Sequence, residues 1–421
     1  MSICFSSAHI LLPDFNRIDG TLWSVVACDQ YTSEPSYWEQ VEKQVGDHPS
    51  TLRLMLPEIY LHDRENRIPA IHENMERALR EWLIPHPESM IYLERTLSDG
   101  TIRRGLIGKV DLEAYDYRQG SISPIRATEG TVLSRIPPRV AVRRGAKLEL
   151  PHVMLLIDDP ERTVIEPLAN RTDSRLAYDF ALMQNGGSVK GVFLSPEAQR
   201  QTLRALEALA APDAFGARYG DASLSPLLFA VGDGNHSLAS AKAYYEELKA
   251  QLGDRALSHP ARYALAEIVN LRDDALAFEP IYRVLFDVDA EDLLKKLKES
   301  LANLNGTALP QTLTAILPDR EISLPVPHPA AQLAVGTLQS FLDAYLEQHP
   351  GVGIDYIHGE DTVRSLVSSA PGRLGFLFAG MQKSDLFRTV LYDGALPRKT
   401  FSMGHAQDKR FYLECRKILG D

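Results

Sequence analysis

A short polar segment, GDGNHS at residues 232–237, has the composition of an anion-binding turn. It follows an apolar stretch, 227–231, that suits a buried strand, and apolar residues then recur every three or four positions from 238 to 252, which predicts a helix. The first turn of a helix presents unpaired N–H groups and a positive dipole end, and flanking glycines let a phosphate approach the backbone. The expected phosphate ligands from this turn are Gly232, Gly234, Asn235, His236 and Ser237.

Asp233 lies in the same turn and would repel an anion unless Mg²⁺ bridges it to phosphate oxygens, so it is the candidate metal ligand. The alternative is a plain Asp-Gly turn in which Asn235 or Ser237 caps the helix. The turn lacks the third glycine of the dinucleotide-binding fingerprint, and the chain contains neither G-x-x-x-x-G-K-[ST] nor H-E-x-x-H. A standard Rossmann site and a P-loop are therefore excluded.

A second polar cluster, CDQYTSEPSYWEQ at 28–40, follows an expected buried strand. Its carboxylates, Asp29 and Glu34, could act as general base or metal ligands on a strand-to-helix loop. The alternative is simple helix N-terminal chemistry, because acidic residues are favoured there in any case.

A third cluster is the basic loop LPRKTFSMGHAQDKR at 396–410. Its basic residues, which stand out in an acidic protein and are the usual side chains for phosphate, are Arg398, Lys399, Lys409 and Arg410, and Thr400, Ser402 and His405 add hydrogen-bond donors. The alternative is a solvated basic loop. A fourth polar run, RATEGT at 126–131, includes Glu129 and Thr131, and it could equally be a turn.

The elements around these clusters interleave strands and helices, which predicts a mixed α+β or α/β fold with mixed sheets and flanking helices. A boundary near Pro212 divides the expected lobes into 1–212, carrying Asp29 and Glu34, and 213–421, carrying the turn and the basic loop. Strands are expected at 21–29, 152–159, 189–195, 227–231, 261–271, 280–286, 353–358, 374–380 and 386–392. A hairpin is expected around Asp99-Gly100, and an edge strand or connector within 317–330. Helices are expected from Pro35, with a Ser36/Glu39 capping box, and at 69–83, 290–304, 338–347, from 360, and at the C-terminus.

The composition of the 421-residue chain is that of an ordinary globular protein with a net charge of −11. This acidity argues against nucleic-acid and anionic-membrane binding, and no apolar run reaches the roughly 20 residues that span a bilayer. Three scattered cysteines and the absence of a basic leader predict a cytoplasmic protein with a small-molecule substrate. The oligomeric state stays open.

Several segments, taken in order, resemble one family. They include CDQYTSEPSYWEQV, LMQNGGSVKGVFL, VGDGNHSLASAKA, HPARYALAEIVN, DYIHGED and LPRKTFSMGHAQDKRFYLE, and together they extend over nearly the whole chain. The family they resemble is the domain-of-unknown-function family 1015, which is similar to nucleotide-dependent kinases of free L-serine. The resemblance implies a ParB/sulfiredoxin-like core with large insertions, and a site for Mg²⁺ with ATP or ADP.

The resemblance also implies roles for individual residues. Asp233, Asn235 and His236 match the phosphate-holding turn, Glu34 matches the catalytic acid with Asp29 next to it, and Lys399 with Thr400 matches a basic-hydroxyl element. Glu129 and Thr131 match an internal acid-x-Thr element. Two departures stand out: Ser237 replaces the arginine that closes the family's turn motif, and Asn235 replaces a histidine. Losing that arginine removes a phosphate contact worth roughly 1.5–3 kcal/mol.

Three functions follow from these patterns. The first is a nucleotide-dependent, Mg²⁺-assisted phosphotransferase acting on a small hydroxylated metabolite such as free L-serine. The alternative is a non-catalytic nucleotide- or metabolite-binding regulator on the same core. The third is a metal-dependent hydrolase using Asp233, His236 and His405, which the lack of zinc-ligand spacing disfavours.

Overall fold

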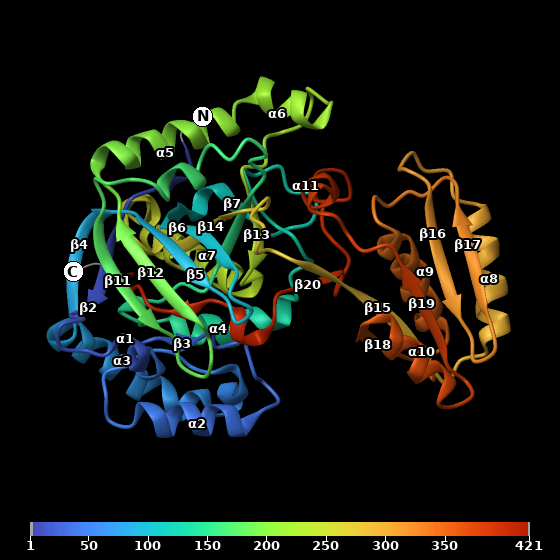
Figure 1. Cartoon of the computed structure of the whole chain (residues 1–421), viewed down its shortest axis with the longest axis horizontal. Helices are drawn as coiled ribbons and strands as arrows, with labels where there is room; N and C mark the ends of the chain where they lie inside the picture. The colour runs from blue at the N-terminus through green and yellow to red at the C-terminus, as the bar shows by residue number, and fades with distance from the viewer. Residues whose placement is uncertain (1–2, 420–421) are drawn as a thin grey trace. The chain divides into compact units, whose positions relative to one another are not determined.

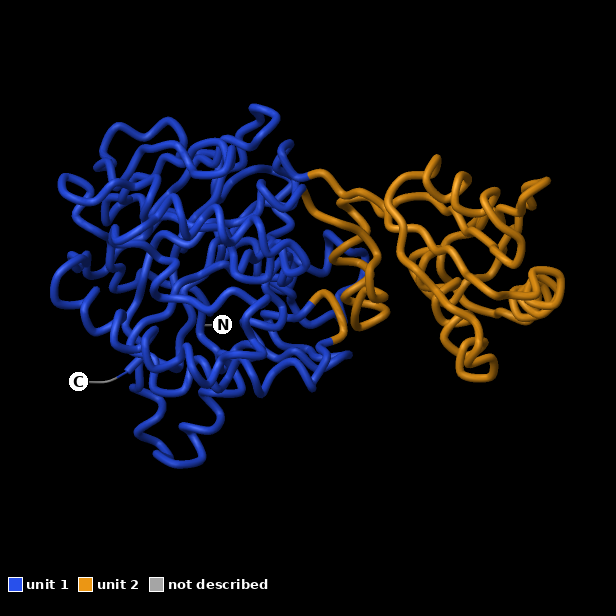
Figure 2. The backbone as a smooth tube through the Cα atoms, turned by 90° about the horizontal axis from the view of Figure 1, so that it is seen from below, with its two compact units in different colours: residues 1–127, 131–276, 405–421 blue, residues 128–130, 277–404 orange. Residues whose placement is uncertain are grey.

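The computed structural model describes residues 3–419 and divides the chain into two compact units (Figure 2). Unit 1 comprises residues 1–127, 131–276 and 405–421, and unit 2 comprises 128–130 and 277–404. This division differs from the boundary expected near Pro212, because strands on both sides of that residue belong to one sheet. The mixed α/β fold class is confirmed.

The main sheet of unit 1 has ten strands and mixed direction (Figure 1). Its order is β11 (Arg175–Ala181), β12 (Ser188–Phe193), β5 (Ile91–Thr96), β6 (Ile102–Asp111), β14 (Tyr263–Asn270), β10 (Met154–Ile157), β13 (Phe229–Asp233), β8 (Ile125–Ala127) and β7 (Tyr115–Asp116), with β1 (Phe5–Ser6) also on β6. Strand β10 runs parallel to β14, and β8 runs parallel to β13 and β7, while the other pairs are antiparallel. The expected Asp99-Gly100 hairpin is the β5–β6 pair.

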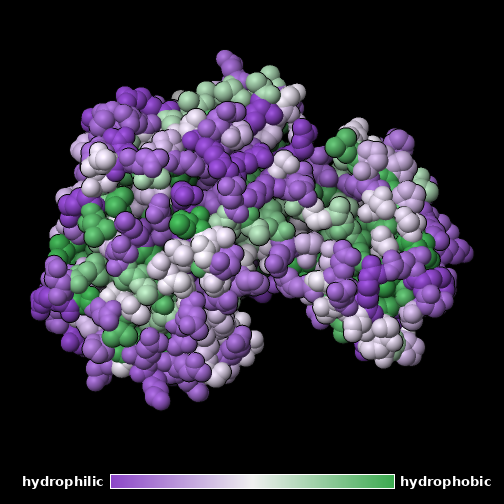
Figure 3. Space-filling model, in the orientation of Figure 1, coloured by the Kyte–Doolittle hydropathy of each residue, from purple (hydrophilic) through white to green (hydrophobic). Residues whose placement is uncertain are grey.

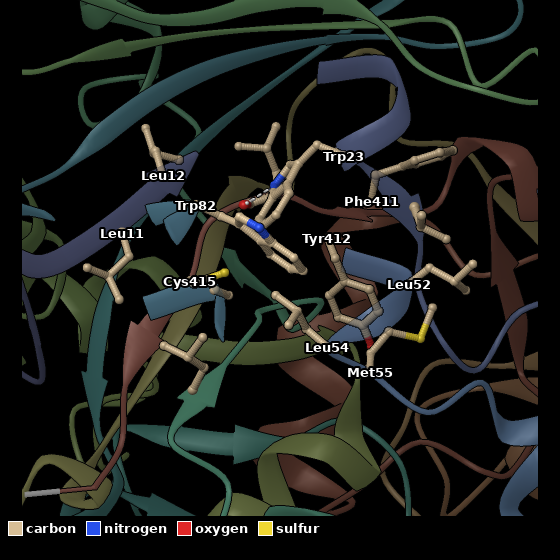
Figure 4. Close-up of a cluster of buried hydrophobic side chains, with 14 of the residues drawn as sticks. Leu11, Leu12, Trp23, Leu52, Leu54, Met55, Trp82, Phe411, Tyr412 and Cys415 are labelled. Carbon is tan, nitrogen blue, oxygen red and sulfur yellow. Dashed lines mark hydrogen bonds between the residues drawn. The ribbon is translucent and has the colours of Figure 1, made fainter. Parts of the chain in front are cut away.

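Alternation along the strands gives this sheet two apolar faces. Ile91 and Leu93 of β5 pack into a cluster that includes residues of α1 (Gly20–Trp23), α2 (Pro35–Val45) and α3 (Arg64–Glu81). Tyr92, between them, packs into a second cluster with residues of α5 (Pro196–Leu209) and α7 (Asn235–Leu252). Figure 4 shows part of the first cluster, where Trp23, Trp82 and Tyr412 lie among aliphatic side chains. The sheet therefore holds α7 firmly, and with it the polar turn at its start.

Shorter elements complete unit 1. Helices α4 (Ile136–Arg143) and α6 (Pro212–Tyr219) are separate from the sheet, and α4 packs against α7 through Ile136, Val140 and Tyr244. Three two-stranded ladders join β2 (Ala8–Pro13) to β4 (Leu83–Ser89), β3 (Val25–Val26) to β21 (Phe411–Tyr412), and β9 (Leu148–Glu149) to β22 (Arg416–Lys417). Two of these ladders bring the C-terminal segment back to unit 1.

Unit 2 is built on a six-stranded sheet of order β17 (Glu321–Val326), β16 (Gln311–Ile316), β19 (Leu374–Phe378), β15 (Phe278–Phe286) and β18 (Gly353–His358), with β20 (Phe401–Met403) on β15. Its helices are α8 (Ala290–Ala302), α9 (Ala334–Gln348), α10 (Glu360–Ser368) and α11 (Lys383–Tyr392). Figure 1 shows α8 running alongside β17. The Pro-rich segment within 317–330 forms the edge strand β17, as expected.

Four expectations about secondary structure are wrong. Of residues 21–29, the first three belong to the short helix α1, which Asp19 caps, and only Val25–Val26 are strand. Residues 386–392 belong to helix α11, because Gln382 and Asp385 form a capping box and one face is buried. Residues 411–419, the described part of the C-terminal segment, are not helical, since Phe411–Tyr412 and Arg416–Lys417 pair with distant strands. Helix α2 does begin at Pro35, but its N-cap is Glu34 without a side-chain hydrogen bond, so Ser36 and Glu39 form no capping box there.

Hydrophilic residues cover much of the face shown in Figure 3, with small hydrophobic areas between them. Within residues 3–419, no helix has the length and apolar character needed to cross a bilayer.

Candidate functional site

The GDGNHS segment forms a strand–turn–helix connection, as its pattern predicts. Strand β13 ends at Asp233, Gly234 adopts a left-handed conformation with φ 76°, and α7 begins at Asn235. Gly234 is the N-cap and provides no side chain, so neither Asn235 nor Ser237 caps the helix in the way the alternative interpretation requires. The amide side chain of Asn235 donates back to the Val231 carbonyl at 3.4 Å.

Packing accounts for both glycines of the turn. A Cβ on Gly232 would lie 2.8 Å from the side chain of Leu156, and one on Gly234 would lie 3.1 Å from the Val153 Cα and 3.3 Å from the His152 Cδ2. The glycines therefore let the turn sit directly against β10 and the residues before it, which brings His152 beside the first turn of α7.

Asp233 forms an ion pair with Lys409 at 3.1 Å, and the two side chains are 22% and 19% exposed. Burial alone would raise the pKa of Asp233, but Lys409 outweighs it, helped by His152 and the Gly234 N–H, so this pKa lies below its usual value. The Gly234 N–H donates to Asp233 Oδ1 at 2.9 Å. The turn thus carries a carboxylate and a lysine that neutralise each other.

His236 is held as a neutral donor. The Val132 N–H donates to His236 Nε2 at 3.3 Å, so the ring proton of the neutral imidazole lies on Nδ1. Burial lowers the pKa of His236, and the positive charges of Arg139 and Arg135 lower it further, while Asp29 acts in the opposite direction. Next to Val132, the buried Thr131 Oγ1 has no hydrogen-bond partner within the described residues.

Ser237 begins a chain of hydrogen bonds that leads into the interior of unit 1. Its Oγ lies 2.9 Å from His152 Nε2, and His152 Nδ1 lies 2.8 Å from the Tyr412 hydroxyl. The Cys28 backbone N–H donates to the same hydroxyl at 3.3 Å. Figure 4 shows the Tyr412 ring beside Leu54 and Met55. The polar turn, the segment before β10 and the Cys28–Asp29 loop are therefore joined through side chains.

The two candidate carboxylates of the N-terminal loop differ in their surroundings. Asp29 is partly buried, accepts a hydrogen bond from the Gln30 amide at 3.0 Å, and acts electrostatically on His236. Glu34 is exposed at the start of α2, where it acts on Tyr31. The structure brings Asp29 toward the turn, and it shows no contact between Glu34 and any turn residue among residues 3–419.

The basic loop at 396–410 is divided between the two units. Arg398, Lys399 and Thr400 belong to unit 2, where Arg398 pairs with Asp343 at 2.6 Å and the buried Thr400 hydroxyl donates to the Pro397 carbonyl at 2.6 Å. The Lys399 side chain is exposed, and its carbonyl accepts from Arg283 at 3.1 Å.

The two remaining candidates lie elsewhere. Glu129 also belongs to unit 2, where it forms a bridge with Leu396. His405, in unit 1, is exposed and acts electrostatically on Asp99 in the β5–β6 turn.

Two residues at the site were not among the predicted candidates: His152 and Tyr412. Lys409 was one of the four basic residues noted in the basic loop, but no feature set it apart from Arg398 or Lys399. His152 and Tyr412 lie 85 and 260 residues from their respective partners, Ser237 and His152, and no local pattern indicates either contact.

A metal ligand set of three or more His, Cys, Asp or Glu side chains is not found within residues 3–419. Mg²⁺ commonly binds through only one or two carboxylates together with substrate phosphates and waters. Asp233 and Asp29 are the carboxylates near the turn, so the residues present fit a phosphate-bridged ion and not an all-protein metal cage.

Comparison with known proteins gives a family and several solved structures. The model of a family described as "Protein of unknown function (DUF1015)" matches residues 14–364. No curated protein matches the chain. A conserved hypothetical protein from Pyrococcus furiosus aligns with a TM-score of 0.34 and 10% identity, covering 74% of this chain and 94% of that one.

Two structures of free serine kinase variants are also similar. The complex with AMP has a TM-score of 0.37 and 9% identity over 72% of this chain and 90% of the kinase. The complex with ADP has a TM-score of 0.37 and 9% identity over 73% and 91%. With TM-scores this low, the chemistry of this chain has to be argued from its own residues.

Proposed function

This chain belongs to the DUF1015 family, and we propose that it is a nucleotide-dependent phosphotransferase acting on a small hydroxylated metabolite. The observation that carries the proposal is the set of groups around the first turn of α7 in unit 1: the uncapped helix N-terminus, Lys409 on Asp233, and the Nδ1–H of neutral His236. Each of these groups favours a phosphate.

The electrostatics support an anion at this turn despite the protein's net negative charge. The dipole of an 18-residue helix is positive at its N-terminus. Arg135 and Arg139 lie close enough to lower the pKa of His236. Arg139 is also bonded to Glu58, with Nε–Oε1 at 2.9 Å, which makes Arg135 and Lys409 the more available cations. A phosphate arriving here would share Lys409 with Asp233.

Phosphoryl transfer needs mainly positioning and charge neutralisation. Asp29 is the stronger of the two proposed bases, because it acts on His236 in the turn whereas Glu34 is exposed on α2. Asp233 and Asp29 would hold Mg²⁺ together with phosphate oxygens, and the ion would neutralise charge on the transferred group. Free L-serine is the first acceptor to test.

The test is thermal unfolding with ATP and with ADP, each with Mg²⁺ or with EDTA. A ligand at 100 times its Kd stabilises the folded state by about 2.7 kcal/mol, which is readily measured. Lys409→Met should abolish most of the shift. Lys249→Met is the matched control, because Lys249 lies in the last turn of α7 and pairs with Glu113 at 2.6 Å. A shift that survives in Lys409→Met, or no shift with any nucleotide, would refute the proposed site.

A second candidate function, a nucleotide-binding regulator without turnover, is favoured by one observation. The position of the family's phosphate-clamping arginine holds Ser237, whose hydroxyl is engaged with His152. Nucleotide binding with no release of ADP, in the presence of a panel of hydroxylated acceptors, would favour the regulator.

A further inference from the structure

A cavity of about 160 Å³ lies beside the first two turns of α7, entirely within unit 1. An engineered apolar cavity of 150 Å³ is large enough to bind benzene. Ser237, Leu238, Ser240 and Ala241 of α7 line one side of the cavity. The space therefore adjoins the helix start at which a phosphate is proposed to bind.

Most of the cavity wall is apolar. The lining includes Leu54, Met55, Leu56, Leu148, Leu150 and Leu265. The wall residues that carry a full charge are two glutamates and two arginines, and these form two ion pairs, Arg139 with Glu58 and Arg143 with Glu149. The wall therefore presents no net charge to a ligand.

The carboxylate of Glu149 is already engaged by several groups. Glu149 also accepts from Arg416 Nε and from the Leu265 N–H, at 2.7 and 2.9 Å. Burial alone would raise the pKa of Glu149, but Arg416 and Arg143 lower it, so the carboxylate stays charged. A zwitterionic amino acid would need an ammonium partner and a carboxylate partner, and it could obtain them only by opening one of these pairs, which is costly in a buried site.

One edge of the cavity is polar, and its side chains form hydrogen bonds and no ion pair with the other wall residues. His152, Ser237 and Tyr412 all line it, and they are the members of the hydrogen-bonded chain described above. His152 is 6% exposed. This edge can receive one hydroxyl group while the rest of a ligand contacts the leucines and methionine.

We propose that this cavity binds the phosphoryl acceptor, and that the acceptor is a neutral, largely apolar alcohol whose hydroxyl contacts His152. The class of ligand follows from the cavity alone, and only the phosphorylation of its hydroxyl rests on the proposed phosphotransferase function. In that reaction the alcohol takes the place of free L-serine as the acceptor.

For this acceptor His152 takes the place of Asp29 as the base, and Asp29 keeps its proposed role as an Mg²⁺ ligand. When Nδ1–H donates to the Tyr412 oxygen, Nε2 is an acceptor, and the acceptor hydroxyl would take the place that the Ser237 hydroxyl has beside it. The proton of the alcohol then passes to Nε2, the alcohol oxygen forms a bond to the γ-phosphorus, and the bond from that phosphorus to the β–γ bridging oxygen breaks, releasing ADP. No other reactant is needed.

The binding experiment uses the full chain without nucleotide and three probes: benzyl alcohol, toluene and L-serine, titrated by ligand-observed NMR. Benzyl alcohol should bind saturably, toluene about five-fold more weakly because it lacks the hydroxyl, and L-serine not measurably. Ala146→Leu and Val142→Phe, which add side-chain volume at two separate positions of the wall, should each abolish binding. Ala208→Leu, on the exposed face of α5, is the control that should leave binding unchanged.

A second arm adds ATP and Mg²⁺ and follows benzyl phosphate by ³¹P NMR. Formation of benzyl phosphate supports the acceptor assignment. Saturable binding of nucleotide and benzyl alcohol without any transfer overturns the role of His152 as base. Absence of benzyl alcohol binding, or tighter binding of L-serine, overturns the cavity assignment while the nucleotide titration still stands. If benzyl alcohol binds but no nucleotide does, the proposed phosphotransferase function is refuted and the alcohol site still stands.

Discussion

The pairing of Lys409 with Asp233 makes a quantitative prediction for the Lys409→Met variant. The charged groups of the two side chains lie 3.1 Å apart, and each side chain is about four-fifths buried. The pair is therefore intermediate between exposed ion pairs, which contribute less than about 1 kcal/mol to stability, and fully buried ones, whose disruption costs about 3–5 kcal/mol. Removing the lysine leaves the Asp233 carboxylate desolvated and without a cation. We expect a loss of about 2 kcal/mol, which corresponds to a fall of about 4 °C in the unfolding midpoint of a large domain.

The same variant makes a prediction about pH. Because the pKa of Asp233 in the folded protein lies below its ordinary value of 3.8, its ionised form stabilises the wild type above that pH, and this stabilisation is lost as the pH falls through the folded value. In Lys409→Met, burial without the lysine raises the pKa of Asp233. Protonation of Asp233 as the pH falls therefore removes the cost of the buried charge, and the variant loses less stability than it does at pH 7. The difference in stability between the two proteins should therefore shrink from pH 7 to pH 3.

Unfolding midpoints of the wild type, Lys409→Met and Lys249→Met across this pH range provide the assay. Lys249 forms a more exposed pair, and its replacement should cost less than about 1 kcal/mol. Equal losses for the two variants at pH 7, or a difference from wild type that does not change with pH, would refute a buried Lys409–Asp233 pair.

Three further predictions concern the turn and the N-terminal loop. Because the pKa of His236 in the folded protein lies below 6.5, stability should fall as the pH drops below about 6.5, and His236→Gln should flatten that slope in a pH series of unfolding midpoints. Gly234→Ala should cost about 1–2 kcal/mol in denaturant unfolding, since φ is 76° and the new Cβ would lie 3.1 Å from the Val153 Cα; an unchanged midpoint would contradict this backbone geometry. Asp29→Asn, which removes a proposed Mg²⁺ ligand, should lower turnover at least about 100-fold, and a larger loss in Glu34→Gln would assign the catalytic carboxylate to Glu34.

Much of the framework around the site could be predicted from local sequence. The change from an apolar run to three-and-four spacing at GDGNHS located β13, the turn and α7, and the Asp-Gly dipeptide located the β5–β6 hairpin. The segment 386–392 was predicted incorrectly because its short apolar run suits either a strand or a helix. The capping box of Gln382 and Asp385, just before it, decides for the helix.

The C-terminal segment shows why the rest could not be predicted. The spacing of its apolar residues is compatible with a helix, yet Phe411 and Tyr412 pair with Val25–Val26, and Cys415 forms a bridge with Leu11. These contacts join the two ends of the chain, so no window of local sequence contains them. Because His152 and Tyr412 meet through the same long-range pairing, the hydrogen-bonded chain to Ser237 was equally hidden.

The cations of the basic loop look alike in sequence but differ in how readily they could exchange their partners. Arg410 is 6% exposed and is held by Glu267, Glu414 and the Pro151 carbonyl, so moving it would strand two buried carboxylates. Arg398 is 60% exposed in a simple surface pair. Lys409 lies between these extremes: it has a single partner, Asp233, and remains 19% exposed beside the start of α7. Of these three cations, Lys409 combines partial burial, which strengthens its attraction for a phosphate, with a partner that Mg²⁺ could take over when the phosphate arrives.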